Sequence, residues 1–254
     1  MASDAALLAR WENLMAAVER PFIRAIIVEK NRYIRAAAET FKRTQGLEQR
    51  DFDEHAAGMQ ELFNRFLTIA IKAATGEVLD GKKGRAPETR DDLWGKLWLY
   101  LAARWLDTHA GTMARETALT TRADLQHIID TAFNDMEDFN PAAVAIRMLR
   151  ARALSRPRAE TIALTEVHNA MMFASEGSAQ RLATDEGVEM RKRWVPVHDE
   201  RTRVNHAAMA RVAPIALDAD FTVGGERMCR PGDPRGGAKN VIRCRCVLAY
   251  DVLE

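Results

Sequence analysis

The spacing of the apolar residues changes near Gly187, and this change limits what the chain can fold into. Before Gly187, apolar side chains recur every three or four residues, as at Leu7, Trp11 and Leu14, which predicts amphipathic helices. After it, the segment 188–197 (VEMRKRWVPV) alternates with a period of two, which predicts a strand. The pattern predicts an α+β fold, with a mostly α-helical N-terminal domain followed by a long helix packed on a small antiparallel β-sheet.

Start and stop signals divide the helical part of the chain. The predicted segments are a first helix through Ile26, a second over 51–76, a loop over 76–87, a helix capped by Thr89, one over 121–138 and a long one that ends near Gly187. Asn140 followed by Pro141 predicts an N-cap with proline at the first helical position. We place the domain boundary near Ser155, so that residues 1–154 form a helical docking domain and residues 155–254 an α+β domain.

Short elements separated by turns are predicted beyond the first strand. Asp199 is predicted to cap a short helix that runs through His206 to Met209. Glycine and proline mark the turns between the elements that follow, and RPGDP at 230–234 predicts a rigid turn because proline fixes φ. Further strands are predicted over 211–217, 221–228 and 241–252.

Charge, hydropathy and cysteine content exclude several classes of protein. Because 37 basic residues oppose 36 acidic ones, with a net charge of +1, any contact with nucleic acid requires a local cluster. No apolar run reaches the ~20 residues of a membrane span, and no basic segment precedes an apolar core at the N-terminus, so we expect neither membrane insertion nor a secretory signal. Three cysteines confined to one end do not make a disulfide framework. Without a P-loop, no small-molecule substrate is predicted.

Four short motifs occur in order in the last third of the chain. They are IALTEVHNA at 162–170, HDERTRVNHAAM at 198–209, RPGDP at 230–234 and NVIRCRCVLAY at 240–250. In this order they resemble the C-terminal domain of the phage Mu F-like head morphogenesis family, the minor head proteins of tailed phages. The chain departs from the family pattern at Leu164, where the family usually has Arg, and at Arg243, where it usually has Asn.

The resemblance implies a structural role rather than an enzymatic one. It implies a minor head (capsid) protein of the virion, made in the host cytoplasm, whose partners are the phage portal protein, the major capsid protein or both, with phage DNA as a further contact. No catalytic residue is expected. The polar residues of the motifs are expected to brace the domain itself; they are Thr165, Glu166, Asp199, Arg201, His206 and Asp233.

The cysteines leave two interpretations open. Cys244 and Cys246 are two apart on a predicted strand and share an otherwise apolar face, which favours two buried thiols and no cofactor. The alternative is a tetrahedral zinc site in which these two thiolates are joined by Cys229 and by His206 or His198.

Five arginines and no acid occupy residues 147–158. They are Arg147, Arg150, Arg152, Arg156 and Arg158. On a helix this segment would concentrate positive charge suited to phosphate or to an acidic protein surface. The alternative is a solvated face whose arginines pair with acids elsewhere. Arg191, Lys192 and Arg193, together with Arg243 and Arg245, are expected to add basic groups in the sheet.

Two other functions compete with the structural one. A metal-dependent nuclease or phosphodiesterase could use the segment from His198 to His206, because imidazoles and carboxylates serve as general acids, general bases and metal ligands. A regulatory DNA-binding protein is the second alternative, and sequence preference in a binding assay would distinguish it from packaging-type contact.

Overall fold

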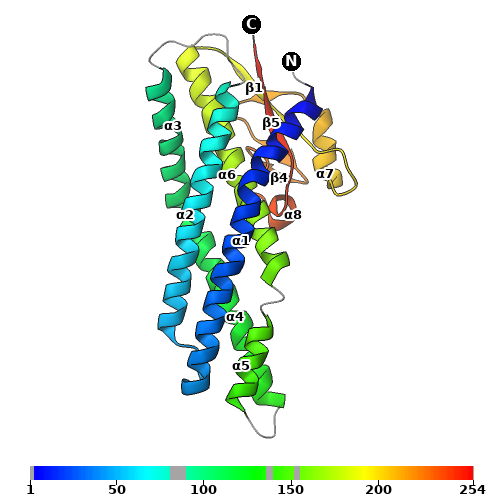
Figure 1. Cartoon of the computed structure of the whole chain (residues 1–254). Helices are drawn as coiled ribbons and strands as arrows, with labels where there is room; N and C mark the ends of the chain where they lie inside the picture. The colour runs from blue at the N-terminus through cyan, green and yellow to red at the C-terminus, as the bar shows by residue number, and fades with distance from the viewer. Residues whose placement is uncertain (1–2, 81–89, 136–139, 152–154, 254) are drawn as a thin grey trace. The chain divides into compact units, whose positions relative to one another are not determined.

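A computed structural model of the chain describes residues 3–80, 90–135, 140–151 and 155–253. The elements described before Gly187 are six α-helices and one π-helical turn (Figure 1): α1 (Asp4–Thr44), α2 (Gln49–Asp80), α3 (Arg90–Trp105), the turn η1 (Leu106–Ala110), α4 (Gly111–Asp135), α5 (Pro141–Arg150) and α6 (Ser155–Glu186). Short elements follow: β1 (Met190–Val195), α7 (Val204–Ala207), the 3-10 turn η3 (Ala208–Arg211), β2 (Ile215–Ala216), β3 (Phe221–Val223), β4 (Glu226–Met228), α8 (Ala238–Val241) and β5 (Val247–Val252). The predicted α+β fold is confirmed.

Two helix boundaries differ from the prediction. The helix predicted to start at Thr121 begins at Gly111, because a π-helical turn leads from α3 into α4 without a loop. The second helix continues past Gly76 to Asp80. The rest of the predicted loop and the predicted cap Thr89 lie outside the described residues.

Two predicted helix ends are confirmed. The side-chain oxygen of Asn140 accepts hydrogen bonds from the backbone N–H groups of Ala142 at 2.9 Å and Ala143 at 3.3 Å, and Pro141 occupies the first turn of α5. α6 stops at Glu186 because Gly187 takes a φ of +61°, the left-handed conformation that ends many helices.

The strands form a three-stranded antiparallel sheet and a hairpin. The sheet has the order β2-β1-β5, with Met190 opposite Val252 and Val195 opposite Val247. β3 and β4 form the separate hairpin, which turns at two glycines with positive φ. The strand predicted over 188–197 is thereby confirmed as β1.

Three predictions for the C-terminal region are wrong in part. The strand predicted over 241–252 begins only at Val247, because α8 ends at Val241 and Arg243 has a φ of +54°, which an extended strand does not allow. Asp199 caps a turn rather than a helix, since α7 starts at Val204 without a side-chain cap. The strand predicted over 211–217 is reduced to two residues.

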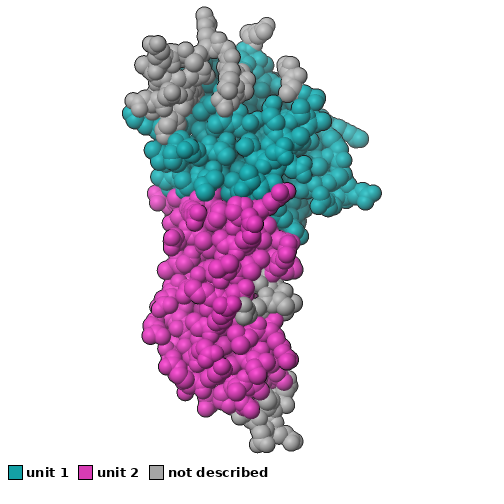
Figure 2. Space-filling view, in the orientation of Figure 1, with its two compact units in different colours: residues 1–19, 67–105, 163–254 teal, residues 20–66, 106–162 magenta. Residues whose placement is uncertain are grey.

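The chain divides into two compact units that are not consecutive in sequence (Figure 2). Unit 1 contains residues 1–19, 67–105 and 163–254, and unit 2 contains residues 20–66 and 106–162. The predicted boundary near residue 155 divides the chain differently, and independent folding of 155–254 stays a prediction. Among the described helices, none is both long and apolar enough to cross a bilayer.

Each unit has its own apolar core. In unit 2 the buried side chains come from α1, α4 and α5 and include Tyr33, Phe41, Leu125 and Met148. In unit 1 one buried cluster gathers side chains of β1, the hairpin and the segment before β5; it contains Trp194, Met209, Phe221, Val223, Met228, Val241, Cys244, Cys246 and Leu248. Two of the four sequence motifs, 198–209 and 240–250, therefore contribute side chains to this core.

Candidate functional site

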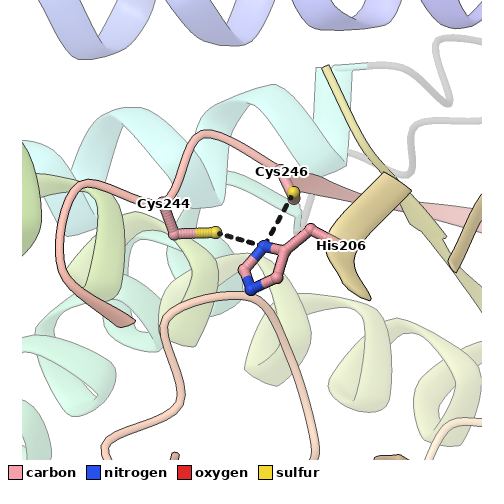
Figure 3. Close-up of side chains that lie close together, drawn as sticks. All are labelled: His206, Cys244 and Cys246. Carbon is pink, nitrogen blue, oxygen red and sulfur yellow. Dashed lines mark hydrogen bonds between the residues drawn. The ribbon is translucent and has the colours of Figure 1, made fainter. Parts of the chain in front are cut away.

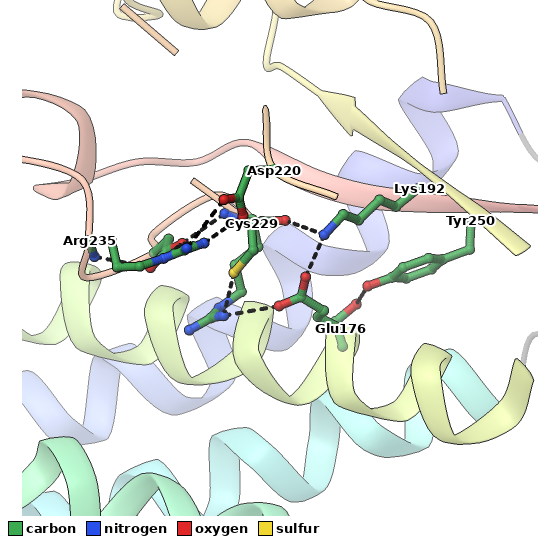
Figure 4. A network of polar contacts seen from close by, with 9 residues as sticks. Glu176, Lys192, Asp220, Cys229, Arg235 and Tyr250 are labelled. Carbon is green, nitrogen blue, oxygen red and sulfur yellow. Dashed lines mark hydrogen bonds and ion pairs between the residues drawn. The ribbon is translucent and has the colours of Figure 1, made fainter. Parts of the chain in front are cut away.

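A buried ion-pair network joins α6 to the sheet in unit 1 (Figure 4). Glu176 on α6 accepts a hydrogen bond from Nζ of Lys192 at 2.6 Å and one from Nη1 of Arg230 at 3.0 Å. Nζ of Lys192 also donates to the carbonyl oxygen of Cys229 at 2.8 Å. Because Lys192 lies in β1, its side chain reaches inward between the outward-facing Arg191 and Arg193. Lys192 is therefore a basic group of the sheet, but it is buried and paired and adds no charge to the surface.

Two further hydrogen bonds connect α6 to the chain around β5. The hydroxyl groups of Ser175 and Tyr250 lie 3.0 Å apart, and burial raises the pKa of Tyr250 above its ordinary value. Nε2 of His168 donates to the carbonyl oxygen of Cys246 at 2.8 Å. Burial lowers the pKa of His168, so the ring that makes this contact is neutral. α6 thus positions the backbone on which the cysteines lie.

The RPGDP turn is organised around Asp233. Its carboxylate accepts hydrogen bonds from the backbone N–H of Cys229 at 2.7 Å and from the backbone N–H and Nε of Arg235 at 3.0 and 2.9 Å. Burial opposes ionisation, but these hydrogen bonds prevail and lower the pKa of Asp233 to about 2. Gly232 has a φ of +72°, and a Cβ there would lie 2.8 Å from Nδ1 of His168, so the turn requires glycine.

The other motif residues contact one another. The backbone N–H of Arg243 donates to Oγ1 of Thr165 at 3.1 Å. The guanidinium of Arg245 donates to both oxygens of Asp199, at 2.6 and 2.7 Å, and holds the pKa of that carboxyl well below its usual range. Glu166 is buried on α6, and the exposed Arg201 lies 3.6 Å from Asp199. Arg243 has a φ of +54°, a left-handed conformation that Asn adopts more readily than Arg.

The structure brings three of the five candidate zinc ligands together (Figure 3). Nδ1 of His206 lies 3.4 Å from Sγ of Cys246 and 3.6 Å from Sγ of Cys244, and all three side chains are buried. Cys229 lies elsewhere, with its Sγ 3.0 Å from Nη1 of Arg230, and burial raises its pKa to about 12. His198 is exposed. We call His206, Cys244 and Cys246 the thiol-imidazole cluster.

The two sulfurs of the thiol-imidazole cluster differ in acidity. A hydrogen bond from Cys244, followed by the contact with His206, lowers the pKa of Cys246 well below the ordinary thiol value. The same sulfur-sulfur hydrogen bond and burial raise the pKa of Cys244. The pKa of Cys246 is therefore the lower of the two.

A cavity of about 350 Å³ beside the cluster is lined by four arginines, and we call it the arginine pocket. Its polar lining consists of Glu19, Arg201, Arg203, Arg243, Cys244 and Arg245. Arg203 donates to the carbonyl oxygen of Ile242, and Arg245 pairs with Asp199. The guanidinium of Arg243 is exposed and makes no ion pair with the residues that the structure describes.

The arginines predicted over 147–158 divide into two pairs. Arg147 and Arg150 are exposed on α5 and have no ion-pair partner within the described part of the chain. Arg156 pairs with Glu160 at 3.0 Å, and Arg158 pairs with Asp124 at 2.9 Å. Arg152 lies outside the described residues.

Sequence reasoning missed the roles of Glu176, Lys192 and Arg230. One signal was present: the period of two that placed Met190 and Trp194 on the buried face also places Lys192 there. A buried lysine that keeps its charge is stabilised by a carboxylate partner. Neither Glu176 nor Arg230 carries a local signal, because Glu176 meets Lys192 and Arg230 only through the packing of α6 on the sheet and the RPGDP turn.

The comparisons with known proteins agree with the motif order. The model of the family described as Phage Mu protein F like protein matches residues 109–249, which is more than half of the chain. No curated protein and no solved structure gave a match. The matched region includes the first three motifs and all of the fourth except Tyr250. The chain therefore belongs to the phage Mu protein F like family, the head morphogenesis family that its motifs resemble.

Proposed function

We propose that the protein is a minor head component that acts by attachment, docking on the portal protein or the major capsid protein during head morphogenesis. The observation that carries this proposal is the family match, which covers the motif region. The contacts of the motif residues support it, because Thr165, Asp199 and Asp233 each bond to other parts of the same unit. Groups engaged in this way stabilise a scaffold that presents surfaces to partners.

The nuclease alternative requires imidazoles and carboxylates that face one substrate. Here His206 is buried against two sulfurs, His198 is exposed, and both oxygens of Asp199 accept hydrogen bonds from Arg245. Incubating the protein with plasmid DNA, with and without divalent metal, tests the alternative. DNA turnover that His206→Ala abolishes would overturn the proposal of an attachment role.

We further propose that Arg147 and Arg150 make the cationic contact, with DNA phosphates or with an acidic face of a head protein. Their spacing of three residues places both on one face of α5. Both side chains are exposed and have no acidic partner within the described residues, so their charge is free to bind a partner. Arg156 and Arg158 already pair with acids and provide a matched control.

The experiment compares two double variants of the full chain, Arg147→Ala/Arg150→Ala and Arg156→Ala/Arg158→Ala. Each is coexpressed with the portal and major capsid proteins of the same phage, and each is titrated with random-sequence duplex DNA over a range of salt. We expect the first variant alone to lose capture of a head protein or to lose DNA affinity. If DNA is the partner, the slope of log binding constant against log salt concentration should become less steep for this variant, by about 0.9 for each phosphate that it no longer neutralises. Equal behaviour of the two variants would refute the assignment, and failure of the unmutated protein to copurify with either head protein would refute the docking role.

A further inference from the structure

The geometry points to a zinc site formed by Cys244, Cys246 and His206, with a fourth position open to water. Bonds of about 2.3 Å from zinc to sulfur and about 2.0 Å to nitrogen, at tetrahedral angles, separate nitrogen from sulfur by about 3.5 Å. The observed separations from Nδ1 of His206 are 3.4 Å and 3.6 Å, so both nitrogen-to-sulfur distances match those of a zinc tetrahedron, and the three ligand atoms all lie within 4.8 Å of one another (Figure 3). This inference does not depend on the proposed function.

The ligands are held in place by contacts outside the cluster. The carbonyl of Cys246 accepts a hydrogen bond from His168, and the backbone N–H of Arg243, next to Cys244, donates to Thr165. Both contacts anchor the cysteine segment to the long helix α6. Supporting interactions of this kind fix the orientation of metal ligands and reduce the entropy lost on binding.

The region around the cluster is the kind that a structural metal stabilises. The strands of unit 1 contain two, three, three, six and six residues, and irregular segments connect them. A small core with few ladder hydrogen bonds gains stability from a cross-link, and bound zinc supplies one directly. Two thiolates also neutralise the charge of Zn²⁺, which makes the ion compatible with a buried position.

The chemistry of the ligands and the access route both fit zinc. Thiolate and imidazole ligands favour zinc over magnesium or calcium, which prefer oxygen. Cys244 forms part of the wall of the arginine pocket, so access to the cluster from this cavity is at Cys244, and its volume of about 350 Å³ has room for water as the fourth ligand. A disulfide between Cys244 and Cys246 is disfavoured because residues two apart rarely meet the required geometry.

The test uses the full chain, stripped with a chelator under reducing conditions, reconstituted with zinc and desalted before elemental analysis. We expect one zinc per chain in the unmutated protein and in Cys229→Ser, whose thiol lies outside the cluster. Cys246→Ser and His206→Ala should lose more affinity than the roughly 10- to 100-fold that follows removal of a residue supporting a metal ligand. Zinc should also raise the Tm of the unmutated protein and of Cys229→Ser.

A second measurement needs no variant and therefore holds even if Cys246→Ser fails to fold. Cobalt in place of zinc in the unmutated protein should show thiolate-to-cobalt charge-transfer absorption with the intensity of two thiolates. Absence of that absorption, absence of zinc after reconstitution, or retention of zinc by Cys246→Ser would each overturn the proposal. Loss of zinc from Cys229→Ser would do the same.

Discussion

Lys192 in unit 1 and Lys30 in unit 2 are both nearly inaccessible to solvent, with 0% and 3% of their surface exposed. Their surroundings differ. Lys192 donates to Glu176 and to a backbone carbonyl, whereas no hydrogen bond or ion pair reaches the ammonium of Lys30 from the described residues. Burial, and next the charge of Arg158, lower the pKa of Lys30 to about 8. Burial alone therefore does not show that a lysine stabilises a fold. A buried lysine stabilises the fold only where hydrogen-bond and ion-pair partners surround its ammonium group.

The two units differ in how their backbone polar groups are hydrogen-bonded. In unit 2 long helices satisfy their own backbone groups, and apolar contacts such as Phe22 stacked on Phe66 at 4.9 Å fill the space between them. In unit 1 short strands leave many backbone groups to be satisfied by side chains. Asn240, which is fully buried, donates to the carbonyl of Val223 at 3.1 Å and to Glu226 at 2.7 Å. Buried polar side chains are accordingly more numerous among the described residues of unit 1, although unit 2 also buries Lys30, Asp51 and His55.

The largest effect is expected from Glu176→Gln. Removing this carboxylate leaves Lys192 and Arg230 buried without their counter-charge, which should lower the free energy of unfolding by about 3–5 kcal/mol. Urea denaturation measures the change. As a control, Glu189→Gln, at a side chain that is 71% exposed, should change stability by less than about 0.5 kcal/mol. Equal effects of the two substitutions would show that the network in unit 1 is dispensable.

Lys30→Met should raise the free energy of unfolding, whereas Glu176→Gln should lower it. The pKa of Lys30 in the folded protein is about 8, below the ordinary 10.5, so the folded state binds the proton less tightly than the unfolded state. At pH 7 this difference lowers the free energy of unfolding by about 3 kcal/mol. Methionine carries no charge and removes this penalty. The penalty is complete below pH 8 and disappears as the pH rises from 8 to 10.5. Thermal unfolding of both proteins at pH 7 and at higher pH measures it. A less stable Lys30→Met would break the contrast between the two lysines.

Asp233→Asn should lower the free energy of unfolding, with the smallest effect of the three substitutions. Because the folded pKa of Asp233 is about 2 and the ordinary value is 3.8, its ionised form contributes about 2 kcal/mol above pH 3.8. That contribution is lost as the pH falls from 3.8 towards 2, so the two proteins should converge in acid. Unfolding curves between pH 7 and pH 2 measure the difference. If the difference in stability between the two proteins stayed constant from pH 7 to pH 2, the effect would come from packing and not from the charge of Asp233.

Local signals were sufficient to predict many helix ends. The cap at Asn140 and the stop at Gly187 depend on residues within one turn, which a sequence shows directly. The start of α4 was misplaced because a π-helical turn has no such signal. The β-strand predicted through Cys244 failed at Arg243, whose positive φ no alternation pattern reveals.

The candidate site was predictable only where its residues are close in sequence or share a motif. The spacing of Cys244 and Cys246, with His206 as a partner, was a correct guide to proximity. Cys229 was grouped with them by residue type alone, and it lies instead beside Arg230. Its position depends on how the hairpin and the RPGDP turn pack on α6, and such long-range contacts carry no local signature.

The discontinuous course of unit 1 has a consequence for synthesis on the ribosome. Every residue of unit 2 has been translated once residue 162 is added, whereas unit 1 needs the stretch 163–254. The residues of unit 2 are thus available for packing first, whereas the first nineteen residues meet the stretch 163–254 of their own unit only after it has been made. Until then, the amphipathic start of α1 remains a surface that chaperones, or other emerging chains, are able to bind.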